Sequence, residues 1–223
     1  MIDASLAVAE LFYSIQGEST RAGLPCAFIR LAGCNLRCRY CDSAYTWEEP
    51  GRRTAIAEIL RWLEQYPGVL VELTGGEPLL QEEIYPLLDE LLAGGRDVLV
   101  ETNGSLPVAQ IPGAVGVILD LKSPASGMDQ QTDWGNLALL AARKTSGSRD
   151  EIKFVLCSEE DYAWAREIIT RHQLAGIAPL LLSPVANLLA PARLAELMLR
   201  DRIPARLQLQ LHRIIWPDQQ RGV

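Results

Sequence analysis

Three cysteines in a short stretch carry the clearest chemistry in this sequence. Cys34, Cys38 and Cys41 follow one another with three and then two intervening residues. Thiolates hold zinc or iron–sulfur clusters, and a structural zinc site usually takes four protein ligands. Neither histidine, His172 or His212, is near the cysteines in the chain. The set of three therefore favours a 4Fe–4S cluster, in which thiolates hold three irons and the fourth iron is open to another ligand.

Other interpretations of the cysteines remain open. The three thiols can be buried and structural, or they can hold zinc in a protein without catalytic activity. Cys26 and Cys157 match no motif, and both are expected in the core. The chain has five cysteines, an odd number, and its first residues lack the basic flank and apolar stretch of a signal peptide. A disulfide framework is therefore not expected.

Composition favours a single cytoplasmic domain over residues 1–223. The 28 acidic and 21 basic residues give a net charge of −7, which argues against a nucleic-acid backbone as the main partner. No apolar run approaches the roughly 20 residues that span a bilayer, so no membrane association is expected. A small molecule is the expected ligand.

Short apolar runs alternate with longer stretches of helical spacing. Strands are predicted at 26–31, 69–73, 98–101, 116–121, 152–156, 180–183 and 207–212. Helices are predicted at 54–66, 81–93, 134–144, 159–172 and 191–200, with Thr54 as an N-cap and Gly94, Gly95 and Gly176 at helix ends. Strand followed by helix is typical of a parallel α/β sheet. A complete eight-unit barrel takes about 250 residues, so we expect an open, partial β/α barrel of about six parallel strands.

Ligands of such folds gather at the carboxyl ends of the strands. Polar and glycine-rich residues stand at five of these ends, at 33–41, 74–78, 102–104, 122–124 and 183–184. The cysteines follow the first predicted strand and therefore lie at the expected ligand edge. The polar stretch 123–133 is expected to be a loop, and the chain end 219–223 is expected to fray.

The cysteine spacing after the first strand of a partial barrel resembles that of the radical S-adenosylmethionine (radical SAM) enzymes. In that family S-adenosylmethionine chelates the open iron through its amino and carboxylate groups, and one electron then releases a 5′-deoxyadenosyl radical. An aromatic residue before the third cysteine is typical of the family, and Tyr40 holds that position. The resemblance implies a 4Fe–4S cluster and S-adenosylmethionine as cofactors, with Tyr40, Cys41 and Asp42 beside them.

Three other strand ends, at 74–78, 101–104 and 123–124, are similar to cofactor-binding elements of this family. The segment 74–78 matches the GGE element, which meets the methionyl amino group, although a plain turn has the same composition. The segment 101–104 is similar to a stretch that reaches the ribose and the carboxylate, with local capping as the alternative. The cofactor-binding residues that the resemblance implies here are Gly75, Gly76, Glu77, Glu101, Asn103, Ser123 and Pro124.

The N-terminal segment Ser14-Ile15-Gln16-Gly17-Glu18-Ser19 narrows the resemblance. It is similar to the YSIQGEG signature of the 7-carboxy-7-deazaguanine synthase family. The members of this family are short radical enzymes of 7-deazapurine (queuosine) biosynthesis. Matches continue at 23–25, 28–31, 41–43, 120–124, 210–213 and 216–217. The resemblance implies a carbon–nitrogen lyase that contracts 6-carboxy-5,6,7,8-tetrahydropterin to 7-carboxy-7-deazaguanine with loss of ammonia.

The resemblance also implies residues for magnesium and substrate. Ser43, two residues after the third cysteine, would hold Mg²⁺ together with the substrate carboxylate, and a hydroxyl suits this ion. The Arg30 guanidinium can pair with a carboxylate through two hydrogen bonds, or it can form a structural ion pair. The implied substrate-binding residues are Ile15, Gln16, Gly17, Glu18, Arg30, Thr74, His212 and Pro217. They come largely from a substrate-facing segment, 1–25, and a predicted strand near the site within 206–217.

Some features depart from the family pattern or leave an alternative. Ser19 stands where the signature ends in glycine, and Arg213 stands where related chains often carry lysine. His212 can be a core residue, and the segment around Gln16 can simply close the barrel. The alternative function is an activase that removes hydrogen from a glycine of a partner protein with the same cofactors. For either radical enzyme the resemblance suggests a homodimer and an electron donor such as flavodoxin.

Overall fold

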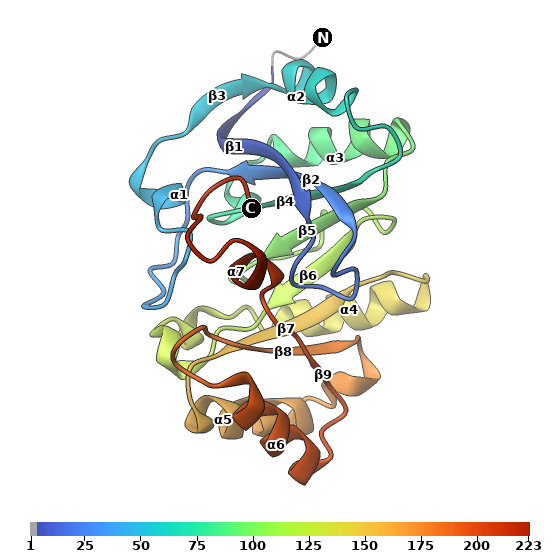
Figure 1. The fold of residues 1–223 in the computed structure, drawn as a ribbon. Helices are drawn as coiled ribbons and strands as arrows, with labels where there is room; N and C mark the ends of the chain where they lie inside the picture. Colours follow the sequence, from blue (N-terminus) through green and yellow to red (C-terminus); the bar gives the residue numbers. More distant parts are fainter. Residues whose placement is uncertain (1–3) are drawn as a thin grey trace.

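In the computed structural model, which describes residues 4–223, one nine-stranded sheet carries the fold (Figure 1). Its strands run in the order β3-β1-β2-β4-β5-β6-β7-β8-β9. They span β1 Ser5–Ile15, β2 Pro25–Leu31, β3 Arg52–Ala55, β4 Leu70–Gly75, β5 Val98–Thr102, β6 Gly116–Asp120, β7 Glu151–Leu156, β8 Leu180–Pro184 and β9 Arg206–Leu207. From β2 to β9 all neighbours are parallel, whereas β1 is antiparallel to both β2 and β3. The predicted open, partial barrel is confirmed.

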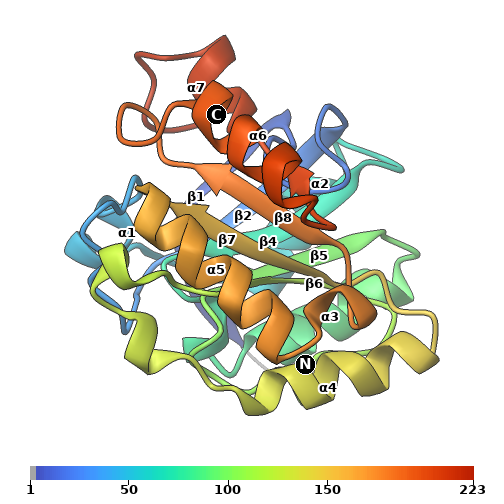
Figure 2. The ribbon, with the colours of Figure 1, turned by 90° about the horizontal axis from the view of Figure 1, so that it is seen from below.

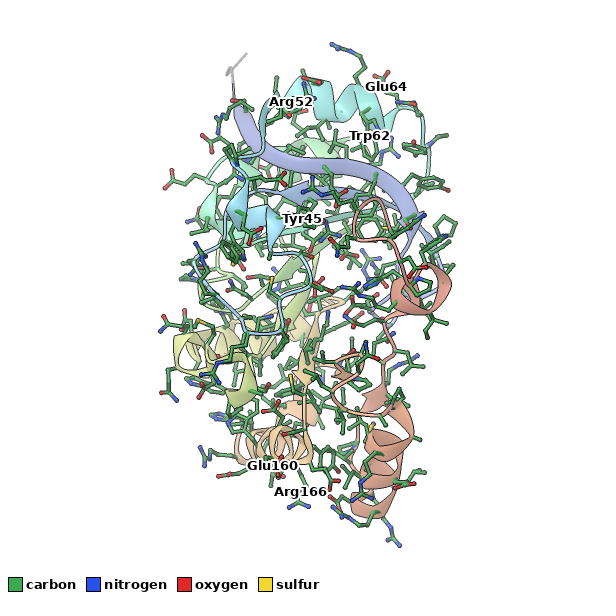
Figure 3. All side chains as sticks on the ribbon, turned by 60° about the vertical axis from the view of Figure 1, so that its left-hand side comes forward. Tyr45, Arg52, Trp62, Glu64, Glu160 and Arg166 are labelled. Atoms are coloured by element: carbon green, nitrogen blue, oxygen red, sulfur yellow. The ribbon has the colours of Figure 1, made fainter. Side chains whose placement is uncertain are left out.

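Helices cover the outer face of the sheet, and Figure 2 shows α4, α5 and α6 there. The α-helices are α1 Tyr45–Glu48, α2 Ile56–Leu63, α3 Ile84–Ala93, α4 Gly135–Thr145, α5 Glu159–Arg171, α6 Pro191–Asp201 and α7 Leu211–Ile215. Four 3₁₀ turns lie at η1 Pro78–Leu80, η2 Pro124–Ser126, η3 Asp129–Gln131 and η4 Leu174–Gly176. Charged side chains project outward at both ends of the molecule, such as Glu64 after α2 and Arg166 on α5 (Figure 3). No helix within residues 4–223 has the length and apolar character to cross a bilayer.

The two faces of the sheet bury different side chains. On the outer face, Ile29, Leu73 and Val100 belong to the main core against the helices. On the inner face, Cys26, Phe28, Leu70, Leu99 and Ile118 form a smaller apolar cluster with Phe12 of β1. Because strand side chains alternate between faces, the next inward positions on β4 to β7 are Glu72, Glu101, Asp120 and Lys153. The inside of the barrel is therefore apolar at its base and charged toward the carboxyl ends of the strands.

A loop between β1 and β2 crosses the open side of the barrel. The Glu151 carboxylate of β7 accepts hydrogen bonds from the backbone N–H and hydroxyl of Thr20. Near the chain end, Gln208 donates to the Gly17 carbonyl at 3.1 Å, and Gln210 donates to Glu18 at 3.2 Å. The loop thus joins the strands at one side of the sheet to those at the other.

Three sequence expectations about the elements are wrong. Thr54 is not an N-cap: residues 52–55 pair with β1 as strand β3, and α2 begins only at Ile56. Gly176 ends the η4 turn, whereas α5 ends at Arg171. The predicted strand at 207–212 is reduced to the two residues of β9, and the helix α7 follows. In all three cases, pairing or packing with distant residues overrides the local pattern.

Most other element predictions are confirmed within a few residues. The helices α4, α5 and α6 lie at the predicted positions, and Gly94 directly follows α3. The helix predicted from residue 81 starts at Ile84, because the Gln81 side chain instead bonds the backbone of Ala7 and the carbonyl of Ala32. The loop 123–133 contains the short turns η2 and η3. Cys26 is fully buried as expected, and Cys157 is half-buried at the end of β7.

Candidate active site

A cavity of about 730 Å³ lies inside the barrel, at the carboxyl ends of the parallel strands. The cysteine loop after β2 lines one side, with Cys34, Cys38 and Cys41. The loop after β1 and the C-terminal segment around His212 line the other side. The topology therefore brings together the two regions of sequence that carry the predicted cofactor and substrate residues.

The first two cysteine thiols are half-buried, and Cys41 is exposed. The Cys34 sulfur accepts a hydrogen bond from the Leu36 backbone N–H at 3.4 Å and one from the Asn103 side chain at 3.8 Å. Burial raises the pKa of the Cys34 and Cys38 thiols, and the nearby Lys122 ammonium opposes this shift. Donors and a cation beside the sulfurs stabilise thiolates, which is the form that binds iron.

The positions of the three thiols bear on whether they hold an iron–sulfur cluster or a single metal ion. Within residues 4–223, only one trio of His, Cys, Asp or Glu side chains has ligand atoms within 4.8 Å of one another, and it is Glu18, Asp42 and His212. The three cysteine sulfurs are not such a trio, so as placed they do not surround a single ion. A cubane cluster binds each thiolate through a different iron, and the separated thiols fit it.

Glycines at the end of β4 hold the base of the cysteine loop. A Cβ atom on Gly75, whose φ is +142°, would lie 2.2 Å from the Leu31 carbonyl oxygen, and one on Gly76 would lie 2.1 Å from that of Gly33. The backbone N–H of Glu77 donates to the same Gly33 carbonyl at 2.8 Å. Because the two glycines lack side chains, the end of β4 can lie directly against the cysteine loop as well as against a bound ligand.

Glu77 does not face the cavity as the sequence analysis expected. Its carboxylate is fully buried and accepts hydrogen bonds from the Leu79 N–H, the Thr102 hydroxyl and the Asn103 N–H. Burial raises its pKa to about 7, although these donors oppose the shift. The Glu77 carboxylate thus ties β4 to the end of β5 in this structure, and its expected contact with the methionyl ammonium stays a prediction.

Two other expected cofactor residues also lie outside the cavity lining. The Ser123 hydroxyl is buried and bonds the Val155 carbonyl and the Asp161 carboxylate, both at 3.0 Å. Pro124 is exposed at the start of η2. These residues hold the loop after β6 against β7. Of the expected cofactor residues, those that line the cavity are Tyr40, Cys41, Asp42, Gly75, Gly76, Glu101 and Asn103.

On the substrate side, all eight expected residues line the cavity: Ile15, Gln16, Gly17, Glu18, Arg30, Thr74, His212 and Pro217. The Gln16 side chain is nevertheless occupied within the protein. Its oxygen accepts from the N–H groups of Glu18 and Ser19 at 3.0 Å, and its amide nitrogen donates to Glu72 at 3.1 Å. These contacts show that the Gln16 side chain shapes the loop, in addition to lining the cavity.

Arg30 reaches the cavity from β2 in a fixed orientation. Its Nε donates to the Glu10 carboxylate at 2.8 Å, and the guanidinium lies over the Phe12 ring at 5.2 Å from the centroid. Glu10 also accepts from the Tyr45 hydroxyl at 2.6 Å. Because only Nε is used by Glu10, the terminal nitrogens of Arg30 remain directed at the cavity and suit a carboxylate.

Replacing Glu10 by glutamine should weaken this orientation. A hydrogen bond to a charged group contributes about 1.5–3 kcal/mol, so we expect KM for a carboxylate substrate to rise about tenfold with a smaller change in kcat. Steady-state kinetics of Glu10→Gln would measure both. The matched control is Glu58→Gln, which removes an exposed pair with Arg52 and should leave KM unchanged. An unaltered KM in Glu10→Gln would show that Arg30 needs no support from Glu10.

Two lysines, the buried Lys153 and the half-buried Lys122, balance the carboxylates of the inner face. Lys153 Nζ lies 2.8 Å from Glu18 Oε2 and 2.6 Å from Glu101 Oε1, and Lys122 lies 2.6 Å from Asp120. Burial opposes the charge of Lys153, but the two glutamates outweigh it and hold the pKa of Lys153 well above its usual value. The predicted cofactor residue Glu101 is thus already ion-paired.

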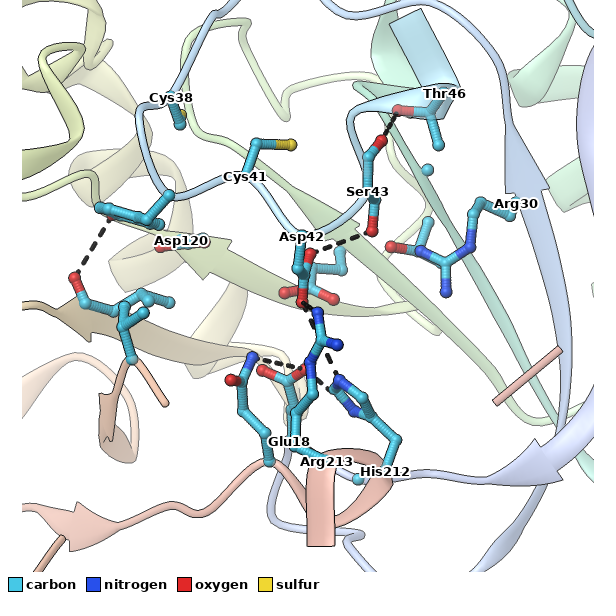
Figure 4. A pocket seen from close by; sticks show the side chains of 18 of the residues that line it. Glu18, Arg30, Cys38, Cys41, Asp42, Ser43, Thr46, Asp120, His212 and Arg213 are labelled. Carbon is cyan, nitrogen blue, oxygen red and sulfur yellow. Dashed lines mark hydrogen bonds and ion pairs between the residues drawn. The ribbon is translucent and has the colours of Figure 1, made fainter. Parts of the chain in front are cut away.

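The predicted magnesium residue lies beside a charged group at the cavity mouth (Figure 4). The Ser43 hydroxyl donates to Asp42 Oδ1 at 3.0 Å, and the other Asp42 oxygen lies 3.5 Å from Arg213 and 3.9 Å from His212. Burial opposes ionisation of Asp42, but Arg30, His212 and Arg213 hold its pKa below its usual value. Asp42 therefore presents a stable negative charge next to the Ser43 oxygen.

The chain end folds back on this mouth, which contradicts the expected frayed tail. Gln219, Gln220 and Val223 line the cavity. The Gly222 N–H donates to Glu10 at 3.0 Å, and the Arg221 guanidinium lies 4.2 Å from the centroid of the Tyr45 ring. The last residues thus add to the wall around Arg30.

Comparison with known proteins places this cavity in a family. Residues 28–123 match the model of the radical SAM superfamily. The chain is 46% identical to the 7-carboxy-7-deazaguanine synthase of Chlorobaculum tepidum over 99% of both chains, and 41% identical to that of Koribacter versatilis over 97% of this chain and 99% of the other. The chain belongs to the 7-carboxy-7-deazaguanine synthase family. Its fold matches the crystal structure of QueE from Escherichia coli with a TM-score of 0.71 and 23% identity, over 92% of this chain and 94% of that one.

Membership of the 7-carboxy-7-deazaguanine synthase family settles the cofactors. A radical SAM enzyme holds a 4Fe–4S cluster and S-adenosylmethionine, and the separated thiols of this chain fit the cluster. The non-catalytic zinc interpretation is therefore wrong. The activase alternative is not favoured, because the full-length relatives carry the synthase name.

Proposed function

We propose that this protein contracts 6-carboxy-5,6,7,8-tetrahydropterin to 7-carboxy-7-deazaguanine and releases ammonia, as part of queuosine biosynthesis. The cavity supports this function, because it joins a three-thiolate loop to a pocket that offers Arg30 to a carboxylate. The atoms balance without an external oxidant or reductant, since substrate and product differ by one molecule of ammonia. The reaction is thus a carbon–nitrogen lyase reaction.

The cysteine side of the cavity serves the cofactor in this proposal. Cys34, Cys38 and Cys41 hold the 4Fe–4S cluster, which with S-adenosylmethionine supplies a 5′-deoxyadenosyl radical. The residues proposed to contact S-adenosylmethionine are Tyr40, Cys41, Asp42, Gly75, Gly76, Glu101 and Asn103, all in the cavity lining. The Asn103 amide already bonds the Cys34 sulfur, so it can adjust both the cluster and its ligand.

The opposite side serves the substrate. Arg30 binds the substrate carboxylate through its terminal nitrogens, and Thr74, on the strand next to it, offers a hydroxyl at the same level. The backbone of residues 15–18 forms one wall, with His212 and Pro217 at the mouth. Holding the bicyclic substrate between these groups orients the carbon that bears the carboxylate toward the cysteine side.

Magnesium is proposed to bind at Ser43, where the Asp42 charge and the substrate carboxylate provide a negative setting. Replacing Ser43 by alanine should therefore raise the magnesium concentration needed for half-maximal activity about tenfold, since one of few protein ligands is lost. Titration of activity with Mg²⁺ measures this, and iron and sulfide content should stay at the wild-type level. An unchanged magnesium titration would contradict the assignment.

The proposed reaction is tested with anaerobic, reduced and cluster-reconstituted protein. With S-adenosylmethionine and 6-carboxy-5,6,7,8-tetrahydropterin, we expect a 7-deazapurine product, ammonia and substrate-dependent 5′-deoxyadenosine. Omission of the pterin is the control for uncoupled cleavage. The absence of a 7-deazapurine from fully loaded protein would refute the proposed function.

We further propose a single cytoplasmic domain over 1–223 that forms a homodimer and receives electrons from flavodoxin. The two sheet edges support dimerisation, because neither β3 nor β9 has an outer neighbour in the part of the chain that the structure describes, so each leaves backbone groups open to pairing. We also propose that no nucleic acid binds, because the net charge of −7 has the same sign as a phosphate backbone. Light scattering of the purified protein tests the dimer, and flavodoxin-dependent turnover tests the donor.

A further inference from the structure

Glu72 is a buried carboxyl on the inner face of β4 that the proposed function does not yet use. Its side chain lines the cavity and is only 2% exposed. In the sheet register it is paired with Phe28 of β2, whereas Arg30 is paired with Thr74, two residues further along. Two residues of strand correspond to about 6.6 Å. Glu72 therefore lies deeper in the barrel than Arg30, at the boundary with the apolar base.

The hydrogen bonds of Glu72 leave acceptor capacity unused. One of its oxygens accepts from the Gln16 side chain at 3.1 Å. Within residues 4–223, no salt bridge reaches Glu72, whereas Glu18 and Glu101 share Lys153 and Asp120 pairs with Lys122. Among these inner-face carboxyls, Glu72 is the one with no cation of its own.

A carboxyl in this position is costly for the folded protein. Burial and the charges of Glu101 and Glu18 raise the pKa of Glu72 to about 8, although Gln16 and Lys153 oppose the shift. Cys26 of β2 also faces Glu72 and contributes no cation. A buried polar group without enough partners destabilises a fold, and a leucine such as Leu70, one inward position earlier, would fit the core. The remaining acceptor is therefore best explained by a ligand.

We propose that Glu72 binds the amino-pyrimidine edge of the substrate and sets its orientation in the barrel. This inference rests on the proposed function. 6-Carboxy-5,6,7,8-tetrahydropterin carries an amino group and a ring N–H side by side, at the end of the bicycle opposite its carboxylate. When Glu72 gives up its proton to solvent as the ligand binds, the resulting carboxylate accepts two parallel hydrogen bonds from such a pair. With Arg30 on the carboxylate and Glu72 deeper on the next strand, the ring lies along the barrel with its amino end inward.

This arrangement makes Glu72 a specificity determinant as well as an anchor. A site built to accept hydrogen bonds rejects a ligand that presents a carbonyl oxygen in place of the amino group, because two acceptors then face each other. Lumazine-6-carboxylate has a carbonyl at the position where pterin-6-carboxylate has its amino group. The two compounds share the bicycle, the ring N3–H and the carboxylate, and lumazine also carries a hydrogen on the adjacent N1, so they differ only along the edge proposed to meet Glu72.

Equilibrium binding of these two compounds to the anaerobic holoenzyme, with S-adenosylmethionine and Mg²⁺ present, tests the inference. We expect wild type to bind pterin-6-carboxylate about 10- to 100-fold more tightly than lumazine-6-carboxylate. In Glu72→Gln the side-chain amide can donate to the carbonyl, so the preference should fall to within about threefold. Glu72→Asp keeps the carboxylate and should keep the preference with weaker binding of both. The matched control is Asp150→Asn, which alters a buried carboxyl outside the cavity lining and should keep the wild-type ratio.

The outcomes separate this inference from the proposed function. If Glu72→Gln keeps the wild-type ratio of affinities for the two compounds, or if wild type shows no preference, Glu72 does not bind the amino edge of the substrate. Neither result contradicts the proposed reaction. If wild type binds neither compound and forms no 7-deazapurine, both proposals fail. Thermal melting accompanies the binding data: a ligand-binding role predicts that Glu72→Gln is at least as stable as wild type, and a purely structural role predicts a lower midpoint.

Discussion

Alanine at position 76 should remove the iron–sulfur cluster from an otherwise folded protein. The added Cβ would lie 2.1 Å from the Gly33 carbonyl oxygen and 2.8 Å from the Cys34 Cβ, so the cysteine loop must move away from β4. A displacement of about 1 Å at a reacting centre can cost about 100-fold in rate. We therefore expect Gly76→Ala to bind little iron after reconstitution and to cleave S-adenosylmethionine at least about 100-fold more slowly than wild type.

The controls for this prediction distinguish the loop from the fold. Cys38→Ala, which lacks a ligand, sets the level expected for complete loss of cluster and cofactor cleavage. Gly113→Ala is the matched glycine control, because its added Cβ meets no atom within 4 Å. It should be as stable as wild type, or slightly more stable, and retain its cluster. Full iron and sulfide content in Gly76→Ala would show that the contact between β4 and the cysteine loop is dispensable.

Replacing Lys153 by methionine should have the largest effect on stability. Lys153 is 4% exposed and is shared by Glu18 and Glu101, so its loss leaves two acidic groups inside the barrel without their cation. Breaking a buried ion pair on one side costs about 3–5 kcal/mol. For a domain of this size, we expect the melting temperature to fall by about 6–20 °C, measured by thermal unfolding in the absence of substrate.

A double variant tests the electrostatic cause of that loss. If unpaired charge is responsible, adding Glu101→Gln to Lys153→Met should restore part of the stability, because one of the two carboxylates that lost their cation becomes neutral. If the loss came only from packing, the two substitutions would add. A melting temperature of Lys153→Met within about 1 °C of wild type would contradict the role of Lys153 as the shared cation.

The sequence predicted those parts of the site that depend on local spacing. The cysteine loop and the segment 74–78 follow buried strands directly, so their place at the ligand edge follows from the alternation of strands and helices. The orientation of Glu77 could not be predicted in the same way. Its side chain turns toward Thr102 and Asn103, which are 25 and 26 residues away in the chain, and only the packing of β4 against β5 brings them within reach.

Among the buried charges, Glu72 and Lys153 could not be predicted as site residues from local spacing, because spacing alone does not show which face of a parallel strand points into a barrel. A signal was nevertheless available: Glu72 and Lys153 have apolar neighbours on both sides within β4 and β7, and Glu101 and Asp120 follow the apolar runs of β5 and β6. In a barrel one face of each strand points inward, so a single charge in such a strand indicates a polar interior. The C-terminal region was mispredicted for another reason, since residues 211–215 form α7 where the Gly17 carbonyl meets the Leu211 N–H.

The loop after β1 forms a wall of the barrel that is attached differently from the strands of the sheet. Its ties to β7 and to the chain end are mostly side-chain hydrogen bonds, from Thr20 to Glu151, Gln208 to the Gly17 carbonyl and Gln210 to Glu18. Separating this wall would break no hydrogen bond between strands, but it would break the buried ion pair between Glu18 and Lys153 of β7. This wall of the cavity is therefore held largely by side chains, whereas β4 and the cysteine loop are held together by backbone hydrogen bonds, from Gly76 N–H to the Leu31 carbonyl and from Glu77 N–H to the Gly33 carbonyl.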